Sequence, residues 1–186
     1  MDPIWKNLSA QPFGPTCAVD DLRIRRLEKQ LGFALPSQLR DAFKAFGAAI
    51  EFDGDVTFVP LEASGVEDER GELALDMFYG PCPGEHSLES ANRMYRGEQV
   101  PSNFAVLASS NSGDQLCIEV SSGRIFFWHH EAEHEDEMLF LAAQSFEELL
   151  KALRVRREAD VDSGVIWDKC VFDLPDPDPS LRRRNK

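Results

Sequence analysis

The chain has 186 residues, of which 42% are hydrophobic and 28% charged. This is the composition of an ordinary globular domain, and it excludes fibrous and wholly disordered proteins. A chain of this length buries enough apolar surface to fold without a disulfide or a metal ion. The net charge of −13 argues against nucleic acid or an anionic membrane as the main partner and favours a basic protein.

The N-terminal third predicts an irregular arm followed by two helices. Three prolines within residues 1–18 favour irregular structure there, although Trp5 could pin the arm to the domain. Residues 20–31 have apolar side chains on one helical face and end at a glycine that suits a helix C-cap. A second helix is expected to begin at Pro36, at the first helical position, and to end at Gly47.

The next segment predicts one strand, an acidic loop and a short helix. Residues 51–61 are expected to form a strand, and Pro60 near its end suggests a sheet edge. Residues 62–72 form an acidic loop, and residues 78–81 read as an aromatic turn. A third helix is expected to open at Ser87.

Residues 104–128 predict an antiparallel meander around which the rest of the chain packs. The three apolar runs are Phe104–Ala108, Leu116–Val120 and Ile125–Trp128, and turn-forming residues at 111–114 and 121–123 separate them. In the second run apolar and other residues alternate, which is typical of a half-buried strand.

The remaining pattern indicates a last strand over residues 138–143 and a closing helix that starts at the capping box Ser145–Glu148. Residues 165–172 could add a strand, and the tail beyond residue 176 is expected to be disordered. The fold class is therefore α+β, with a mostly antiparallel sheet of about five or six strands flanked by about four helices.

The sharpest catalytic motif is His130-Glu131-Ala132-Glu133-His134, a formal H-E-x-x-H. Zinc proteases place the two histidines one turn apart on a helix, with the glutamate activating the metal-bound water. Here the motif follows a strand and precedes an acidic run, so we interpret it as a solvated turn. No phosphate-binding loop or nucleophile-elbow motif is present in the sequence.

Two acidic clusters are the candidate partner-binding residues, because complementary charge speeds encounter with a basic protein. Tyr79 and Trp128 beside them could act as aromatic anchors, although core packing is the alternative for both. For the clusters themselves, plain solvated loops are the alternative. The acidic candidates are Glu67, Asp68, Glu69 and Glu72 in the first cluster and Glu131, Glu133, Glu135, Asp136 and Glu137 in the second, with His130 beside them.

The four cysteines lie far apart, without a C-x-x-C pair. This pattern favours reduced thiols in a cytoplasmic protein. The first ten residues lack the basic and apolar regions of a secretory leader, which supports the same expectation.

The order and spacing of several short motifs resemble the SUKH superfamily. They are an L-G-x-x-L-P step at Leu31–Pro36, the later F-Y-G, and a meander of the form G-D-x-x-C followed by G-x-I-x-F-W-x-H. The resemblance covers about Val19 to Leu153, which leaves an N-terminal arm at 1–18 and a partly disordered C-terminal extension at 154–186. The W-x-H-E ending of the family falls on Trp128, His130 and Glu131, so His134 lies outside the family pattern.

The resemblance implies a non-enzymatic protein-binding module with no catalytic residues to carry over. Many relatives look like immunity proteins that neutralise a cognate toxin, often a nuclease, and others are similar to regulators of cell-wall synthesis. We therefore expect a cytoplasmic immunity protein that binds a basic toxin domain and needs no cofactor or metal. A regulatory scaffold without a toxin is the alternative, and a zinc hydrolase using residues 130–134 ranks third. The sequence leaves the oligomeric state open.

Overall fold

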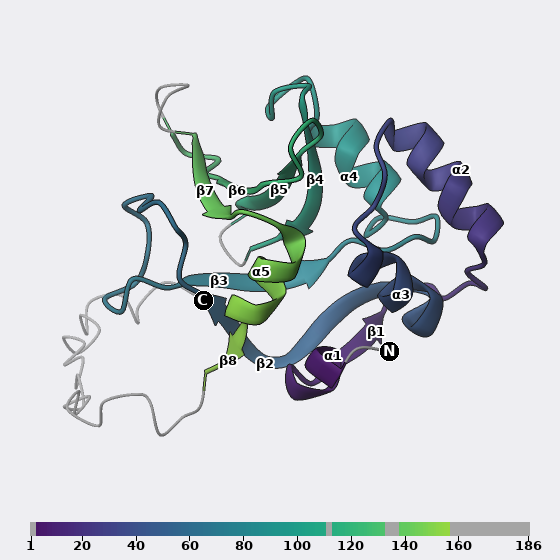
Figure 1. Cartoon of the computed structure of the whole chain (residues 1–186), viewed down its shortest axis with the longest axis horizontal. Helices are drawn as coiled ribbons and strands as arrows, with labels where there is room; N and C mark the ends of the chain where they lie inside the picture. The colour runs from purple at the N-terminus through teal and green to yellow at the C-terminus, as the bar shows by residue number, and fades with distance from the viewer. Residues whose placement is uncertain (1–2, 111–112, 133–137, 157–186) are drawn as a thin grey trace, which may run out of the picture. The chain divides into compact units, whose positions relative to one another are not determined.

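The computed structural model describes residues 3–110, 113–132 and 138–156. The described residues form five helices and eight strands (Figure 1). In chain order these are α1 (Pro3–Asn7), β1 (Ala10–Phe13), α2 (Asp21–Leu31), α3 (Ser37–Phe46), β2 (Ala49–Phe58), β3 (Leu73–Phe78), α4 (Leu88–Tyr95), β4 (Phe104–Ser109), β5 (Gln115–Glu119), β6 (Ile125–Trp128), β7 (Leu139–Ala143), α5 (Phe146–Ala152) and β8 (Arg154–Val155).

All strands belong to one antiparallel sheet with the order β1-β2-β3-β4-β5-β6-β7, and β8 pairs with β2. The α+β class and the antiparallel sheet are as predicted, but the predicted counts were too low. The elements that the sequence analysis did not predict are α1, β1, β3 and β8.

The sheet curls until the segment after β2 reaches its far edge. The Leu61 amide donates to the Ala142 carbonyl at 3.3 Å, and the Glu62 amide donates to the Leu141 carbonyl at 2.9 Å. These bonds cover part of the outer edge of β7, which would otherwise present unpaired backbone groups. The β2–β3 loop (residues 59–72) is thereby held beside the last strand of the sheet.

β2 is an interior strand, so the expectation of a sheet edge at Pro60 is wrong. β3 pairs along one side of β2, and β1 and β8 pair along the other side at its two ends. Pro60 lies beyond the last residue of β2, Phe58, and therefore costs no hydrogen bond of the ladder. The bend between the two halves of β2 lies at a register shift that includes Gly54, whose φ is +119°.

The N-terminal arm is ordered, which corrects the expectation of irregular structure. Trp5 on α1 is fully buried, and its ring lies edge-on to Phe46 at 6.3 Å and to Phe78 at 5.7 Å. β1 pairs with β2 at the edge of the sheet, where Pro12 is tolerated because one side of the strand needs no donor. Burial of a large aromatic ring therefore fixes this arm despite its prolines.

The predicted capping residues Ser87, Ser145, Gly32 and Gly47 begin and end the helices as expected, and Asp20, predicted as the first residue of its helix, is the N-cap. The side chains of Asp20, Ser87 and Ser145 each accept a hydrogen bond from the backbone N–H three residues on. Gly32 and Gly47 end α2 and α3 in the left-handed conformation. Pro36 lies one residue earlier than predicted, at the N-cap of α3.

The meander β4-β5-β6 is confirmed, but its middle strand is buried on both faces. Leu116 and Ile118 face one side, and Cys117 on the other side is fully buried as well. Burial raises the pKa of the Cys117 thiol, so this cysteine is an inert core residue. The prediction of a half-buried strand is therefore wrong, because further parts of the chain cover the second face.

The helices cover the sheet, with α3 against β2, α4 against β4 and α5 against β7, while α2 packs on α4 (Figure 1). Phe78 is the centre of the core, and Phe146 lies 5.6 Å from it, ring to ring. The buried Asn92 of α4 donates to the Val106 carbonyl and accepts from the Val106 amide, at 2.9 and 3.0 Å. It thus pairs the backbone of β4 where the register with β5 shifts.

Cys17 and Cys82 form a disulfide, so the expectation of reduced thiols is wrong for this pair. The bond joins the segment before α2 to the turn after β3. The Arg23 guanidinium strengthens the same junction by donating to the Pro81 carbonyl at 2.9 and 3.2 Å. The two cysteines are 65 positions apart in the sequence, and only the fold brings them together.

None of the helices that the structure describes is long and apolar enough to cross a membrane. The chain divides into two units, residues 1–156 and 157–186. The strand considered at 165–172 and the tail expected to be disordered both lie outside the described residues.

Candidate functional site

A cleft of about 490 Å³ opens between the β2–β3 loop, the end of β8 and the turn after β6. We call it the acidic cleft. Among the described residues that line it, five carry carboxylates and one carries a guanidinium. The charged and titratable lining residues are Asp55, Asp68, Glu72, Asp114, Glu131, Arg156, His129 and His130.

Glu72 is a structural residue of the acidic cleft, although the sequence analysis placed it on the surface. Its side chain is 8% exposed because two arginines cover it. The carboxylate accepts from Arg154, from Arg156 at 3.0 Å and from the Thr57 hydroxyl at 2.8 Å. Burial raises the pKa of Glu72, but the hydrogen bonds from Arg156 and Thr57 and the charge of Arg154 outweigh it, so the pKa lies below its ordinary value. Glu72 therefore ties β8 to β2 and β3.

Glu67 and Asp68 fold the β2–β3 loop. The Glu67 carboxylate accepts from the Ser64 amide at 2.5 Å and from the Gly65 amide at 2.8 Å. Asp68 accepts from the Arg70 and Glu72 amides through one oxygen, and its other oxygen pairs with Arg156. The hydrogen bond from the Glu72 amide is the main cause that holds the pKa of Asp68 below its usual value. Both carboxylates are thus committed to loop structure.

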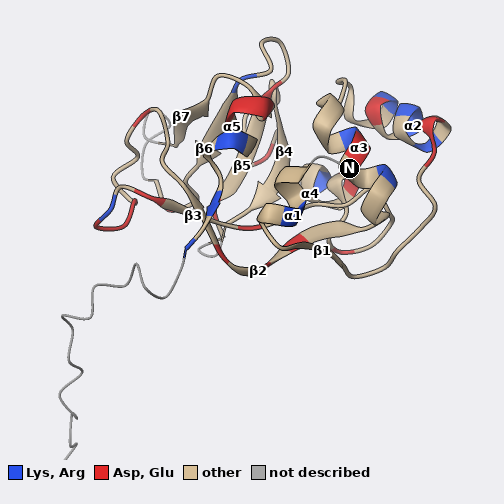
Figure 2. Cartoon of the chain, turned by 60° about the horizontal axis from the view of Figure 1, so that its bottom comes forward, with Lys and Arg blue, Asp and Glu red and all other residues tan. Residues whose placement is uncertain are grey.

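Three further acidic side chains at the loop and the cleft are exposed. Glu69 lies at the tip of the β2–β3 loop, and Asp55 and Glu131 lie on the rim of the acidic cleft. Figure 2 shows the acidic positions of this loop in red. These three carboxylates are free of the loop-building hydrogen bonds of Glu67 and Asp68 and can meet a partner.

The β2–β3 loop also carries exposed apolar side chains. Val59, Leu61 and Val66 are 49%, 59% and 41% exposed, and Val66 lines the acidic cleft. We take this loop as a candidate binding surface, because exposed apolar surface marks protein-interaction sites. These three residues were not among the predicted anchors, which were aromatic.

Tyr79 and Trp128 are core residues, which corrects their prediction as partner anchors. They are 8% and 2% exposed, so neither offers surface to a partner. Trp128 lies 5.9 Å from the ring of Tyr95. Burial raises the pKa of Tyr79 to about 12, and its hydroxyl donates to Gln115 Oε1 at 3.0 Å. Neither side chain lines the acidic cleft.

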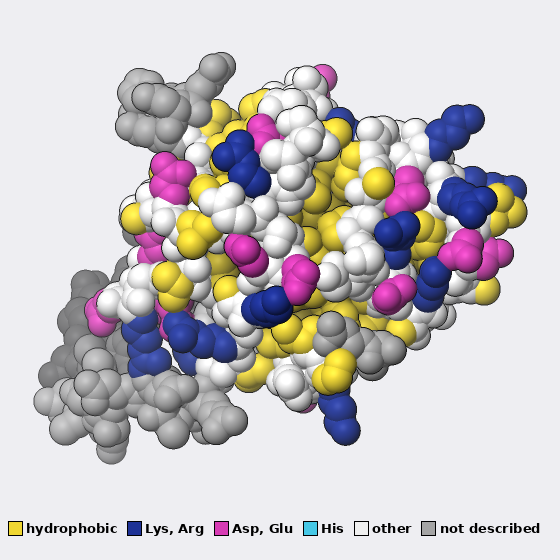
Figure 3. Space-filling model, in the orientation of Figure 1, with side chains coloured by type: hydrophobic (Ala, Val, Ile, Leu, Met, Phe, Trp, Pro, Cys, Tyr) yellow, Lys and Arg dark blue, Asp and Glu magenta, His cyan; other side chains and the backbone are white. Residues whose placement is uncertain are grey.

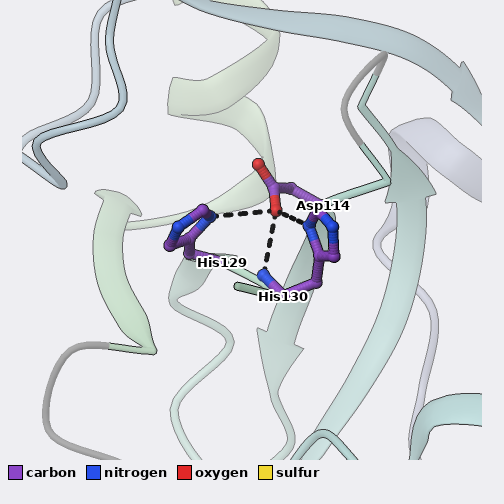
Figure 4. A group of neighbouring side chains, drawn as sticks. All are labelled: Asp114, His129 and His130. Atoms are coloured by element: carbon purple, nitrogen blue, oxygen red, sulfur yellow. Dashed lines mark hydrogen bonds and ion pairs between the residues drawn. The ribbon is translucent and has the colours of Figure 1, made fainter. Parts of the chain in front are cut away.

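Asp114, His129 and His130 converge at one end of the acidic cleft (Figure 4). Oδ1 of Asp114 lies 3.1 Å from His129 Nδ1 and 2.7 Å from His130 Nδ1, and it accepts from the His130 amide at 2.9 Å. Asp114 is 2% exposed, whereas the side chain of His130 is 35% exposed. A buried carboxylate thus holds two imidazoles against it at the surface of the domain.

The register of two strands explains this convergence. Gln115 of β5 pairs with Trp128 of β6, so Asp114 and His129 extend the same antiparallel ladder by one position. The Gln115 side chain donates to the Gly113 carbonyl at 2.8 Å and thereby fixes the approach to Asp114. The chain after β6 forms a turn at residues 130–131 rather than a helix, so the geometry of a helical H-E-x-x-H is absent from the described part of the motif.

Five residues named in the sequence analysis lie outside the described residues. They are Glu133, Glu135, Asp136 and Glu137 of the second acidic cluster and His134 of the H-E-x-x-H. The role of the acidic residues in partner binding stays a prediction.

The face of the domain drawn in Figure 3 differs from the acidic cleft. Acidic and basic side chains are interspersed there among apolar ones, without a block of one sign. A second cleft, of about 430 Å³, lies along α2 and carries both Arg23 and Arg26 together with Asp20 and Glu89. Of these two clefts, the one at the β2–β3 loop has an excess of carboxylates, and the one along α2 has acidic and basic side chains in equal number.

Comparison with known proteins agrees with the fold and the motifs described above. The profile of the SMI1 / KNR4 family (SUKH-1) matches residues 18–152. The chain is 33% identical over 165 residues to the SPbeta prophage-derived uncharacterized protein YokK of Bacillus subtilis (strain 168), a match that covers 82% of this chain and 84% of the relative. The chain therefore belongs to the SMI1 / KNR4 family (SUKH-1).

Proposed function

We propose that this protein is a non-enzymatic immunity protein that neutralises a basic toxin by binding it at the acidic cleft and the β2–β3 loop. The observation that carries the proposal is the combination of surfaces on that loop. Exposed apolar side chains at residues 59, 61 and 66 lie in the same loop as the first acidic cluster. Val66 also lines the acidic cleft, whose described lining residues include five carboxylates and one guanidinium.

The two kinds of side chain have different parts in binding. Val59, Leu61 and Val66 bury apolar surface, which supplies affinity and slows dissociation. Asp55, Glu69 and Glu131 attract a basic partner and orient it during encounter. A basic cleft that grips nucleic-acid phosphates is a fitting target for such a surface, which makes a nuclease the favoured kind of toxin.

Family membership supports a binding role. SUKH proteins resemble binding modules, and many look like immunity proteins. The relative from Bacillus subtilis is described as prophage-derived, and its own function is uncharacterized. The alternative is a regulatory scaffold, which predicts several weak partners in place of one tight partner.

The test begins by capturing the partner on the tagged full-length chain at low salt and eluting it with a salt gradient. The association rate constant is then measured at several salt concentrations for the wild type and for the triple variant Asp55→Lys, Glu69→Lys, Glu131→Lys. These positions are exposed and do not build the loop, so the variant changes charge while the fold is kept. We expect association to slow at least about tenfold at low salt and the difference to shrink at high salt.

A matched control changes the same amount of charge elsewhere. Asp41, Glu85 and Glu98 are exposed and lie outside the acidic cleft. The variant Asp41→Lys, Glu85→Lys, Glu98→Lys should slow association less than the cleft variant does. Equal slowing by both triple variants would show that net charge, rather than the acidic cleft, steers the partner.

Leu61→Ser with Val66→Ser tests the apolar part. We expect faster dissociation with little change in the association rate, because both side chains are exposed and are buried only by the partner. An unchanged dissociation rate contradicts the proposed contact.

We propose the cytoplasm as the location, because a toxin that attacks nucleic acid acts there. Disulfides persist mainly in oxidising compartments, so the Cys17–Cys82 bond of the structure agrees with a cytoplasmic location only if the bond is reduced in the cell. Alkylation of intact cells followed by mass spectrometry measures this directly. A Cys17–Cys82 bond that is already formed in the cell contradicts the cytoplasmic location.

A further inference from the structure

We propose that Asp114, His129 and His130 bind one divalent transition-metal ion, of which zinc is the reference. The proposal goes beyond the proposed function, because it requires no toxin and holds for the isolated protein. The three residues converge in the folded chain at the end of the acidic cleft, as Figure 4 shows.

The distances suit a metal ion of this size. One ligand atom from each residue can be chosen so that all three lie within 4.8 Å of one another. Bonds of 2.0–2.1 Å to a tetrahedral zinc ion place neighbouring ligand atoms about 3.3 Å apart. Asp114 Oδ1 lies 3.1 and 2.7 Å from the two Nδ1 atoms, so two of the three ligand–ligand distances are already close to that spacing.

The ligand types select the class of ion. Two imidazole nitrogens and one carboxylate oxygen suit zinc and its neighbours in the first transition row, whereas calcium and magnesium prefer oxygen ligands throughout. Three protein ligands leave a fourth position open. His129, His130 and Asp114 all line the acidic cleft, so the open position faces that cleft.

The surroundings hold the ligands in place. Buried Asp114 is fixed by the His130 amide, and its own carbonyl accepts from the Ser110 amide at 2.9 Å. On the outer side of His130, Nε2 lies 3.8 Å from Glu131 Oε1, which is the place where metal-binding histidines usually have a carboxylate. Gly113 has a φ of +91°, which glycine adopts without strain, whereas the space beside it would accept a Cβ at an ordinary contact distance of 3.7 Å from the His130 ring.

This site differs from the zinc-protease motif of the sequence. It uses His130 with its neighbour His129 and with Asp114 from the preceding hairpin, and it does not require His134. A bound ion would link the β4–β5 turn to the end of β6 and so stabilise the folded state by mass action.

The experiment uses the full-length chain, stripped with a chelator and titrated with Zn²⁺ in a calorimeter, with Co²⁺ absorption as a second readout of coordination. We expect one equivalent to bind and the melting temperature to rise with Zn²⁺ concentration. His129→Asn and His130→Asn place an amide N–H where Nδ1 lies, so each can keep the hydrogen bond to Asp114 while losing a good ligand. Each should weaken zinc binding more than about 100-fold, and Glu131→Gln should weaken it about tenfold.

Two histidine variants serve as matched controls. His86, whose ring lies 4.9 Å from that of Phe13, is remote from the cleft, and His134 belongs to the H-E-x-x-H. His86→Ala and His134→Ala should bind zinc as the wild type does. Absence of zinc binding by the wild type, or binding that survives both Asn variants, would overturn the proposal. Loss of binding in His134→Ala with retention in His129→Asn would assign the ion to the H-E-x-x-H instead.

Discussion

Replacing Glu72 by glutamine removes one negative charge from the lining of the acidic cleft and keeps the shape of the side chain. The wild-type carboxylate joins Thr57 of β2 to Arg154 of β8 and to Arg156 just beyond it. The glutamine retains an acceptor for the Thr57 hydroxyl but loses the charge that both arginines contact. The contact between β8 and the rest of the sheet should weaken.

The exposure of each partner sets the size of the effect. Arg154 is 55% exposed, so its ion pair contributes at most about 1 kcal/mol. Arg156 is 27% exposed and Glu72 8%, so their charge-assisted hydrogen bond lies nearer to the range of about 1.5–3 kcal/mol. We therefore expect Glu72→Gln to lower the free energy of unfolding by about 2 kcal/mol at pH 7.

The effect has a defined pH dependence. The pKa of Glu72 is lower in the folded state than its ordinary value of 4.5, so ionisation of Glu72 favours folding above that pH. The stabilisation is lost as the pH falls through the folded-state pKa. The wild type and Glu72→Gln should therefore differ most at pH 7 and converge at acidic pH.

Urea unfolding of both proteins at pH 7, 6, 5, 4 and 3.5 measures the difference directly. Glu69→Gln is the matched control, since Glu69 is exposed on the same loop, and it should leave the free energy of unfolding within about 0.5 kcal/mol of the wild type. A Glu72→Gln effect that is constant with pH, or no larger than that of the control, would refute the role assigned to the carboxylate.

Three further changes test the fold. Reducing the Cys17–Cys82 disulfide, or replacing both residues by serine, should lower the free energy of unfolding by up to about 4 kcal/mol, because the bond closes a long loop in the unfolded chain. A loss below about 1 kcal/mol, measured by urea unfolding, would contradict this stabilising role. Gly80→Ala should destabilise by about 3 kcal/mol or more, because a Cβ there would lie 2.2 Å from the Ala49 amide nitrogen; a melting temperature equal to that of the wild type would contradict this close contact. Trp5→Ala should cost about 3–5 kcal/mol, and a cost below about 1 kcal/mol would show that the N-terminal arm is detached in solution.

Local signals predicted the parts of the fold whose structure is decided locally. Ser87 and Ser145 cap helices through their own side chains, and Gly32 ends one in a conformation that glycine adopts freely. The elements that were missed depend on contacts distant in sequence. β8 has two residues and exists through its pairing with β2, and the arm is ordered because Trp5 finds a place among core rings. No local pattern encodes such contacts.

The same distinction between local and long-range contacts applies to the candidate site. The acidic loop was found from composition, but the structural role of Glu72 depends on Arg154 and Arg156, which only folding brings near. The role of Glu67 is local, because its carboxylate accepts from amides two and three residues earlier. The Asp114–His129 contact could have been predicted, because the turn at residues 121–123 sets the β5–β6 register. The helical H-E-x-x-H directed attention to His134 instead.

The central claim is that the protein neutralises a toxin by direct one-to-one binding. The most direct measurement is a titration of the captured partner's toxic or nuclease activity with this protein at low salt. The account predicts that the partner's activity falls in proportion to added protein and reaches zero near one equivalent. When the partner is dilute, more of the variant Asp55→Lys, Glu69→Lys, Glu131→Lys than of the wild type should be needed to abolish that activity. A partner that binds tightly yet keeps its full activity at a large excess would contradict it.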